Sequence, residues 1–519
     1  MVSKITSSGW TFAGLWILFV IGTAVLSHRF PAVDTDEVFI GVHGYNLLSG
    51  KGDRYSLFDD IYAPPIDNFR DAFGQVEETV YNTWVGLWLK ICRHYWVGRC
   101  ASLSAGCLAV GMFYAIGCAI RNRPLGLLLG LLLMVDPIFI TASSLIRPET
   151  LLLLSSAVVL WLILKLPPNF FLKGFWIGLL SGLQVAIHPN ALALLPGFWV
   201  LAFCLEERRR RASMVGTLIV GAGGGILLAL LSTDLHRLWL AHETFVAQMS
   251  RPPLFSPPHS LGGLFHLITA KALMTQTSFP DDPRGQWRMG LTLRYIGIGG
   301  GLLGISFAPG EDSTRKALFY GLLVSFLATV ALVAQKELSY QVNLYPFLLP
   351  LIALYGVQQN RSLPVIHRIL KALSGLSILG SFCFFLLFAN DYWHRYTPFP
   401  EVQSQLAALV PDQKLKMVAP NLFWFQWPVD RFRDLGAMSY SHWLSGGQRD
   451  VSLWLGRWSP TIIVVDPPFK RIFLGPGPTA LRLAHVLNTG VRYIGTIDTR
   501  NGSYGPFEVY EVRWPQGVK

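Results

Sequence analysis

The segment ASMVGTLIVGAGGGILLALLST, residues 212–233, contains no Asp, Glu, Lys or Arg. At 1.5 Å per residue, a helix of this length can cross the ~30 Å hydrocarbon core of a bilayer. The same lack of charge recurs in four other segments, namely 101–120, 317–335, 338–360 and 372–390. One such segment could be a buried helix of a soluble protein, but five predict an integral membrane protein.

The overall composition agrees with this prediction. Of the 519 residues, 52% are hydrophobic and 14% charged, whereas a soluble protein is usually about 25% charged. The net charge of +12 does not indicate nucleic-acid binding, because basic residues gather in the cytoplasmic loops of membrane proteins. The six Cys form no C-x-x-C motif, so we interpret them as small packing residues rather than a disulfide framework.

Hydropathy predicts an α-helical polytopic membrane protein with about eleven transmembrane helices. The expected spans are 9–27, 101–120, 124–142, 149–165, 174–188, 190–205, 212–233, 291–309, 317–335, 339–358 and 371–390. No A-x-A cleavage site follows the first span, so we expect a retained helix and not a signal peptide. The fourth, fifth and sixth spans are short, which favours tilted or partly re-entrant segments.

The charges of the loops predict the orientation. With the N-terminus in the cytoplasm, every loop on the inner side is basic, as the positive-inside rule requires. These loops contain Arg121 and Arg123; Lys165 and Lys173; 208–211; Arg315 and Lys316; and Arg361, Arg368 and Lys371. The alternate loops are poor in basic residues, and 28–79 has ten acidic against four basic residues. We expect a bacterial inner (plasma) membrane protein with its C-terminal region outside.

The chain divides into two expected domains. Residues 1–391 form the membrane domain, with outer loops at about 28–98 and 234–288. Within the first loop, 81–96 has the spacing of an amphipathic helix lying at the membrane interface. Residues 392–519 read as a small extracytoplasmic α/β domain, with strands at 461–465, 493–497 and 507–512 and helices at 400–409 and 479–487. No catalytic signature is present in this tail.

Polar side chains at span ends form the candidate site. All of them fall on the outer side of the predicted topology, although other residues fix that topology. They are Asp36 and Glu37, Arg147 and Glu149, His188, Lys336, Tyr340 and Tyr345. The carboxylates of Asp36, Glu37 and Glu149 could accept a proton from an acceptor, while cations could stabilise a departing lipid phosphate. Sugar transfer from a lipid phosphate needs both.

Each candidate also has a structural interpretation. Arg147 could reach the lipid headgroups, Glu149 could pair with it, and His188 could be a helix-end group. Lys336 could be an interfacial anchor, and Asp34 could lie in solvated loop. Asp136, which precedes Pro137 inside the third span, is either a functional intramembrane acid or part of a kink.

A divalent metal stays an open alternative, because acidic and His residues also occur in the outer loops. They are Glu77, Glu78, His236, His242, Glu243 and His259. No H-E-x-x-H spacing is present, so the sequence predicts no defined metal site and no certain cofactor.

At these residues the chain resembles the GT-C membrane glycosyltransferases, and above all the family 39, or dolichyl-phosphate-mannose protein mannosyltransferase-like, superfamily, which includes aminoarabinose lipid A transferases. Asp36-Glu37 after the first span looks like that family's acidic pair. Residues 144–149 are similar to its Arg-x-Asp/Glu motif, and 178–196 to a hairpin where His188 stands in place of a common Lys. Residues 340–351, with Pro346 and Pro350, are similar to its late-span pattern.

The resemblance implies an inverting transfer in which Asp36 is the base. The implied partners are a polyprenyl-phosphate-sugar donor, a lipid, glycan or protein acceptor and membrane lipids, with no nucleic acid. The chain departs from the family where a His-Pro-Pro run is replaced by 81–84, and it lacks the β-trefoil insert of eukaryotic protein mannosyltransferases. A bacterial or archaeal homologue therefore fits better.

Two alternatives remain from the sequence. A transporter or lipid flippase would usually show paired repeats and broken helices that meet at the midplane, and no clear repeat is present. A non-catalytic scaffold, or a ligase that uses diphosphate-linked glycans, is the other alternative.

Overall fold

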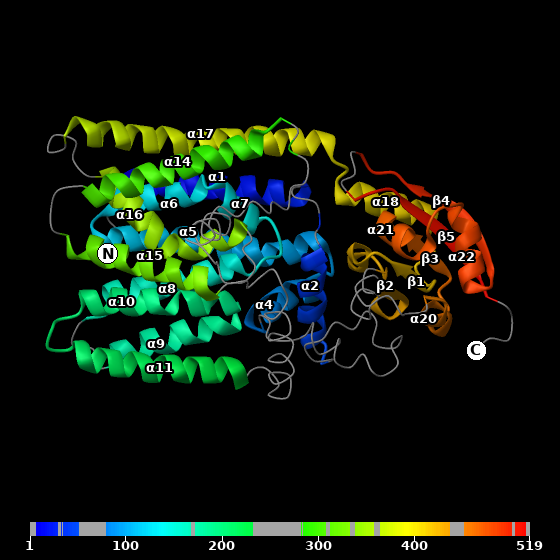
Figure 1. Cartoon of the computed structure of the whole chain (residues 1–519), viewed down its shortest axis with the longest axis horizontal. Helices are drawn as coiled ribbons and strands as arrows, with labels where there is room; N and C mark the ends of the chain where they lie inside the picture. Colours follow the sequence, from blue (N-terminus) through cyan, green and yellow to red (C-terminus); the bar gives the residue numbers. More distant parts are fainter. Residues whose placement is uncertain are drawn as a thin grey trace, which may run out of the picture. The chain divides into compact units, whose positions relative to one another are not determined.

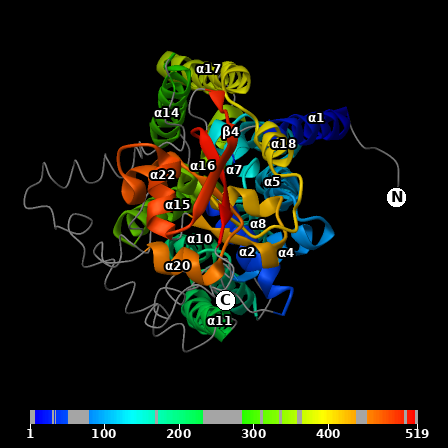
Figure 2. The ribbon, with the colours of Figure 1, turned by 90° about the vertical axis from the view of Figure 1, so that its right-hand side faces the viewer.

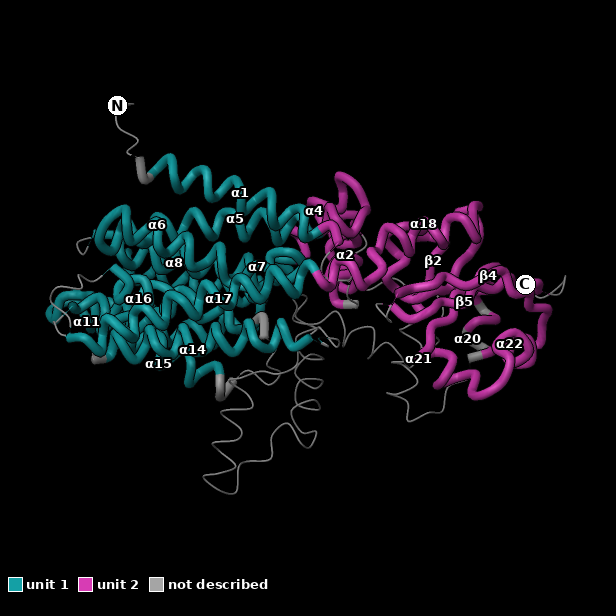
Figure 3. The backbone as a smooth tube through the Cα atoms, turned by 90° about the horizontal axis from the view of Figure 1, so that it is seen from above, with its two compact units in different colours: residues 1–27, 76–81, 99–390 teal, residues 28–75, 82–98, 391–519 magenta. Residues whose placement is uncertain are grey.

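The computed structural model (Figure 1) is mostly helical and falls into two compact units (Figure 3). It describes residues 7–29, 33, 35–50, 79–167, 172–231, 282, 284–307, 312–332, 338–357, 364–435, 451–500 and 504–514. The first unit comprises Met1–Ser27, Val76–Tyr81 and Arg99–Asn390. The second comprises His28–Gln75, Asn82–Gly98 and Asp391–Lys519.

Helices make up the described part of the first unit. They are α1 (Ser7–Arg29), α5 (Tyr95–Ile120), α6 (Arg123–Met134), α7 (Pro137–Ser143), α8 (Glu149–Lys165), α9 (Lys173–Leu183), α10 (Leu195–Leu205), α11 (Arg211–Leu231), α14 (Gln286–Phe307), α15 (Ser313–Leu332), α16 (Tyr345–Val357) and α17 (Val365–Arg395). The short 3-10 helices η2 (Gln184–Ala186), η3 (Pro189–Ala193) and η4 (Leu338–Leu344) lie at the breaks between α9, α10, α15 and α16.

Every predicted span coincides with one or two of these helical segments, so the chain is a multi-span membrane protein. Within the described ranges, five helical segments are long and apolar enough to cross a bilayer, or six if the bent pair α6–α7 counts as one span. The total of eleven spans stays a prediction. Two helices begin about six residues before the predicted spans, because α5 starts at Tyr95 and α17 at Val365.

The break between α6 and α7 explains the Asp136-Pro137 pair. The two helices meet at 69°. Pro137 has no N–H to continue the helix, and the Asp136 carboxylate accepts a hydrogen bond from the Phe139 N–H at 2.9 Å, capping α7. The Asp-Pro pair is therefore a kink, as one of the two interpretations predicted.

Glycines set the contact between α9 and α11, which lie side by side (Figure 1). A Cβ added at Gly178 would lie 2.3 Å from the Leu218 carbonyl oxygen, and one at Gly221 would lie 2.2 Å from that of Phe175. Only glycine permits this backbone approach, which lets two apolar helices pack without large side chains between them.

A mixed five-stranded sheet forms the centre of the second unit. Its strands are β1 (Met417–Ala419), β2 (Phe432–Asp434), β3 (Ile462–Val465), β4 (Gly490–Ile497) and β5 (Phe507–Arg513), in the order β2-β1-β3-β5-β4. β1 is parallel to β2 and β3, whereas β5 is antiparallel to β3 and β4. The predicted strands became β3, β4 and β5, and the predicted helices became α18 (Phe399–Leu409) and α22 (Thr479–Leu487).

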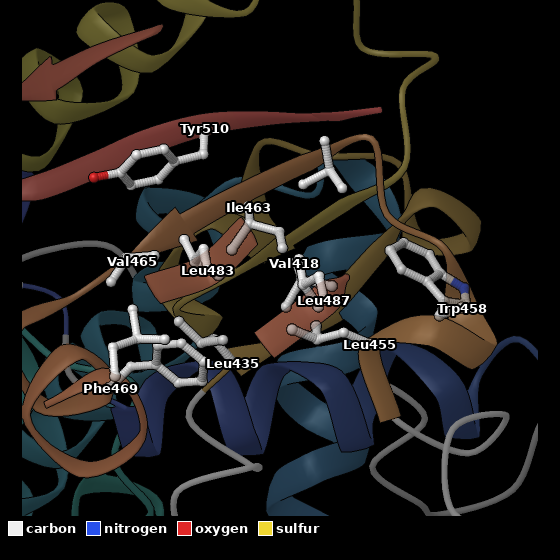
Figure 4. Packing of buried hydrophobic residues seen from close by; sticks show 12 residues of the cluster. Val418, Leu435, Leu455, Trp458, Ile463, Val465, Phe469, Leu483, Leu487 and Tyr510 are labelled. Carbon is white, nitrogen blue, oxygen red and sulfur yellow. The ribbon is translucent and has the colours of Figure 1, made fainter. Parts of the chain in front are cut away.

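One hydrophobic cluster of this unit lies on one face of the sheet, and the alternate residues of β1 and β3 are buried on the other face. Val418 from β1 and Ile463 from β3 are fully buried against Leu483 of α22 and Leu455 of α20 (Val451–Trp458), as Figure 4 shows. In the view of Figure 2, α20 and α22 lie beside one another. Burying these aliphatic side chains contributes roughly 1.5–3 kcal/mol each.

Two segments of the first predicted loop belong to the second unit. They are α2 (Thr35–Leu47) and most of α4 (Thr79–Ile91). The predicted interface helix 81–96 does not run through to residue 96. The chain is helical up to Ile91, is not helical at 92–94, and is helical again from Tyr95, the first residue of α5. Trp84 and Trp88 remain on α4, with ring centroids 6.4 Å apart.

Candidate functional site

The first group of site residues lies at the start of α8. Arg147 and Glu149 flank Pro148, which ends the preceding turn, and both side chains are buried. The Arg147 backbone is fixed to α5, because its N–H donates to the Ser102 hydroxyl at 3.0 Å and its carbonyl accepts from that hydroxyl at 3.1 Å. Glu149 lies in the first turn of α8, where the helix dipole favours a negative charge.

His188 joins this group from a different hairpin. Its Nδ1 accepts a hydrogen bond from the Asn190 N–H at 3.0 Å, so the imidazole caps the turn that Pro189 begins. Glu149 and Arg147 both act on this ring electrostatically. The ring also lies 5.5 Å from that of Tyr340, which η4 supplies in a T-shaped contact.

We call Arg147, Glu149, His188 and Tyr340 the cationic cluster, after the Arg147 guanidinium, which is its one permanent cation. Three segments of the first unit, far apart in sequence, bring these four residues together, and η4 packs directly against α8. Arg147, Glu149 and His188 are each at most 8% exposed. Charges withdrawn from water interact more strongly with each other and with an anion than charges on a surface.

Tyr345 belongs to a second network, centred on Arg294 of α14. The Arg294 guanidinium contacts the Asp136 carboxylate at 2.7 Å, the Tyr345 hydroxyl at 2.5 Å and the Gln341 amide oxygen at 2.8 Å. The Tyr345 hydroxyl donates to Asp136 at 2.6 Å. Asp136 is thus both a cap and an ion-pair partner, and the network ties α7, α14 and α16 together.

The predicted acidic pair lies on α2, in the second unit. Glu37 is fully buried and Asp36 is exposed, although they are neighbours in the first turn. Residues of the tail hold α2 in place. A Cβ at Gly41 would lie 3.4 Å from the Trp424 ring, and the Tyr45 ring meets Trp424 edge-on at 6.0 Å.

α4 closes the other side of α2. A Cβ at Gly44 would lie 2.1 Å from the Asn82 carbonyl oxygen, so the two helices cross at backbone contact. Arg93, just after α4, donates to the Trp427 carbonyl and stacks over the Trp424 ring at 5.4 Å. The first turn of α2 therefore has a fixed support within its unit.

Several predicted residues fall outside the described part of the chain. They are Lys336, Asp34 and the candidate metal ligands Glu77, Glu78, His236, His242, Glu243 and His259. Among the residues that the structure describes, no three His, Cys, Asp or Glu side chains gather into a metal site. A divalent metal bound by the outer loops therefore stays an open alternative.

Sequence reasoning missed Arg294, Gln341 and Ser102. Arg294 sits within a predicted span beginning at 291, and an intramembrane cation is itself a signal of a buried partner. Nothing in the local sequence identifies Asp136, 158 residues away, as that partner. Ser102 looks like any small residue of an apolar helix.

Comparison with known proteins gives results at the level of structure only. No protein family and no curated protein matches the sequence. The structure of ArnT from Cupriavidus metallidurans in the apo state is similar, with a TM-score of 0.56 and 12% identity over 98% of this chain and 100% of that one. ArnT from the same organism bound to undecaprenyl phosphate gives a TM-score of 0.55 and 13% identity over the same shares of the two chains.

A weaker likeness is to the apo oligosaccharyltransferase of Archaeoglobus fulgidus, with a TM-score of 0.45 and 12% identity over 94% of this chain and 74% of that one. The two ArnT structures establish the fold class over nearly the whole chain. The protein has a GT-C-like fold, with several membrane-spanning helices and a C-terminal region built on a mixed sheet.

Proposed function

We propose that the protein is an integral membrane glycosyltransferase. It transfers a sugar from a polyprenyl-phosphate donor to a lipid, glycan or protein acceptor on the non-cytoplasmic face, with inversion at the sugar. The observation that carries this proposal is the cationic cluster, in which Arg147 and His188 are withdrawn from water beside Glu149 in a chain of GT-C-like fold.

In this proposal the cationic cluster binds the donor phosphate. When the bond between the anomeric carbon and the phosphate oxygen breaks, the phosphate gains negative charge. The guanidinium of Arg147 is a fork of donors that suits a phosphate, and its burial strengthens the interaction. Lys336, which lies outside the described residues, is the proposed second cation. Tyr340 orients His188 through the ring contact.

The acidic pair supplies the base. Asp36 is exposed, so it can take the proton from an acceptor hydroxyl or amine as that group attacks the anomeric carbon. Glu37 is buried beside it in the first turn of α2. Glu149 is the second candidate base, and variants of the two carboxylates distinguish them.

The test uses purified protein in liposomes that contain a synthetic polyprenyl-phosphate sugar. Mass spectrometry of the lipid phase is expected to show the carrier as a monophosphate without its sugar, and the sugar on an acceptor. Matched liposomes receive the same sugar on a diphosphate carrier and are expected to show no transfer. Transfer from the diphosphate donor alone, or flux of the intact lipid without transfer, would overturn the proposal.

A further inference from the structure

A groove runs between α14 and α15, and η4 supplies residues both to it and to the cationic cluster. The two helices are consecutive in the chain, yet each packs against α16 more closely than against the other. They enclose a cavity of about 360 Å³. The groove uses one face of each helix: Arg294, Ile298 and Leu302 on α14, and Phe319, Leu322 and Phe326 on α15.

The lining of the groove is almost wholly apolar. Arg294 and Leu302 are two turns apart, so the groove follows α14 for ~12 Å at 1.5 Å per residue. Its rim opens on the apolar outside of the helices, where Phe319 is 37% and Leu323 is 44% exposed. Water in this groove would find few hydrogen-bond partners. If the groove were empty, the side chains that line it would lack dispersion contacts on that side.

The polar groups are confined to one end. The Arg294 charge is already matched by Asp136 at 2.7 Å, and the Gln341 amide nitrogen donates to the Tyr295 hydroxyl at 2.7 Å. The Tyr295 proton has no acceptor among the described residues, although this side chain lines the cavity. The end of the groove therefore offers one neutral hydrogen-bond donor and no uncompensated charge.

We infer that this groove binds one acyl chain of a membrane glycerolipid, with the ester carbonyl accepting a hydrogen bond from Tyr295. The apolar faces take the chain, and the neutral donor takes an uncharged oxygen. A polyprenyl phosphate is the less suitable occupant, because Nε, Nη1 and Nη2 of Arg294 already donate to Asp136, Gln341 and Tyr345, which leaves only the neutral Tyr295 hydroxyl for a phosphate. Binding of the acyl chain does not depend on glycosyl transfer.

The first test is photocrosslinking of the full-length protein in liposomes with a phosphatidylethanolamine that carries a diazirine in its acyl chain. Crosslinked peptides are expected from α14 and α15 around Leu302 and Phe319. Leu302→Trp fills the groove and should reduce this crosslinking about tenfold, the effect of roughly 1.4 kcal/mol of binding. Leu303→Trp is the matched control, because Leu303 is 56% exposed beside the groove and not in it.

The second test addresses the hydroxyl. Tyr295→Phe keeps the ring and removes the donor, so native mass spectrometry of the detergent-purified protein should show a several-fold loss of co-purifying glycerolipid. Tyr320→Phe on α15 is the control, because Tyr320 is 50% exposed and does not line the cavity. It should leave the bound lipid unchanged.

Two results would overturn the inference. One is crosslinking by the glycerolipid that is equal in the wild type, Leu302→Trp and Leu303→Trp, which would mean only general contact with the bilayer. The other is crosslinking of these peptides by a diazirine polyprenyl phosphate that excess glycerolipid fails to displace. Thermal unfolding of each variant confirms that a loss of signal does not come from misfolding.

Discussion

The ion pair of Asp136 and Arg294 is buried within the membrane domain. Both side chains are nearly inaccessible, and Tyr345 and Gln341 complete their hydrogen bonds. Taking two charges out of water is costly, and only the mutual attraction and the added hydrogen bonds offset the cost. Removing one partner leaves the other as an uncompensated buried charge.

We therefore expect Asp136→Leu or Arg294→Met alone to destabilise the protein by about 3–5 kcal/mol. The double variant should recover most of that loss, because no unpaired charge remains. Thermal unfolding in one detergent, read for both single variants and the double variant, measures the coupling as a double-mutant cycle. Additive losses in the double variant would show that the two side chains do not stabilise each other.

Glu508 in the tail gives a prediction about pH. Burial alone would raise its pKa, but hydrogen bonds from Tyr510 at 2.6 Å and Lys470 at 3.0 Å outweigh burial and hold the pKa of Glu508 below its ordinary value. A depressed folded-state pKa stabilises the fold above the unfolded pKa, and the contribution is lost as the pH falls through the folded pKa.

Glu508→Gln should therefore weaken the tail at pH 7, and the difference from the wild type should diminish as the pH falls through the folded-state pKa of Glu508. The two partners Lys470 and Glu508 are 40% and 26% exposed, so solvent screening limits the loss to about 1 kcal/mol. Hydrogen exchange of the β5 amides, compared between variant and wild type at each pH, reads this difference. A variant that exchanges like the wild type at pH 7 would contradict the prediction.

At the scale of elements, patterns of apolar and β-branched residues were sufficient for the expected spans and for three strands of the tail, but they did not predict the 13-residue α2. They predicted a helical segment at every expected span, and they predicted β3, β4 and β5. They missed β1 and β2, because each has three residues and its neighbours in the sheet, not its own pattern, define it. The end of α4 was missed for a similar reason, since the amphipathic spacing continues through 92–94 where the chain is not helical.

The candidate site could also be predicted only where its residues have a local sequence signal. The four members of the cationic cluster could be singled out from the sequence because motifs at span ends marked each of them, whereas their role in binding a phosphate stays a prediction. The sequence marked Asp136 as an intramembrane acid, but its partners Arg294 and Tyr345 come from α14 and α16, and nothing in the sequence around Asp136 identifies them. The contact between α2 and the tail depends on Trp424, which is 377 positions beyond the last residue of α2, Leu47.

The crossing of α2 and α4 can be tested with two glycines. Gly44→Ala would place a methyl group 2.1 Å from the Asn82 carbonyl oxygen, so the helices must separate. We expect it to reduce turnover at least tenfold, because the support of the acidic pair is disturbed. Gly22→Ala on α1 is the control, since nothing lies within 4 Å of its added Cβ and it should keep wild-type turnover. Equal turnover in both variants would contradict the proposed support of Asp36.

At the scale of the whole molecule, the GT-C-like fold agrees with a multi-span protein whose loops alternate in charge. The orientation follows from those charges and stays a prediction. A phosphatase fused after Trp514 should be active only if the tail lies outside, whereas a cytoplasmic fluorescent reporter at the same place should be dark. An inactive phosphatase and a bright fluorescent reporter would place the acidic pair and the tail on the cytoplasmic side. The proposed reaction on the non-cytoplasmic face would then be wrong.

The most direct test of the proposed function compares four purified proteins in the liposome assay: the wild type, the site variants Asp36→Asn and Arg147→Gln, and one control variant. Glu207→Gln, whose side chain is 63% exposed at a surface loop, serves as the matched control. The proposal predicts that both site variants insert normally and lose transfer by at least a hundredfold, while the control keeps wild-type transfer. Wild-type transfer by both Asp36→Asn and Arg147→Gln would contradict it.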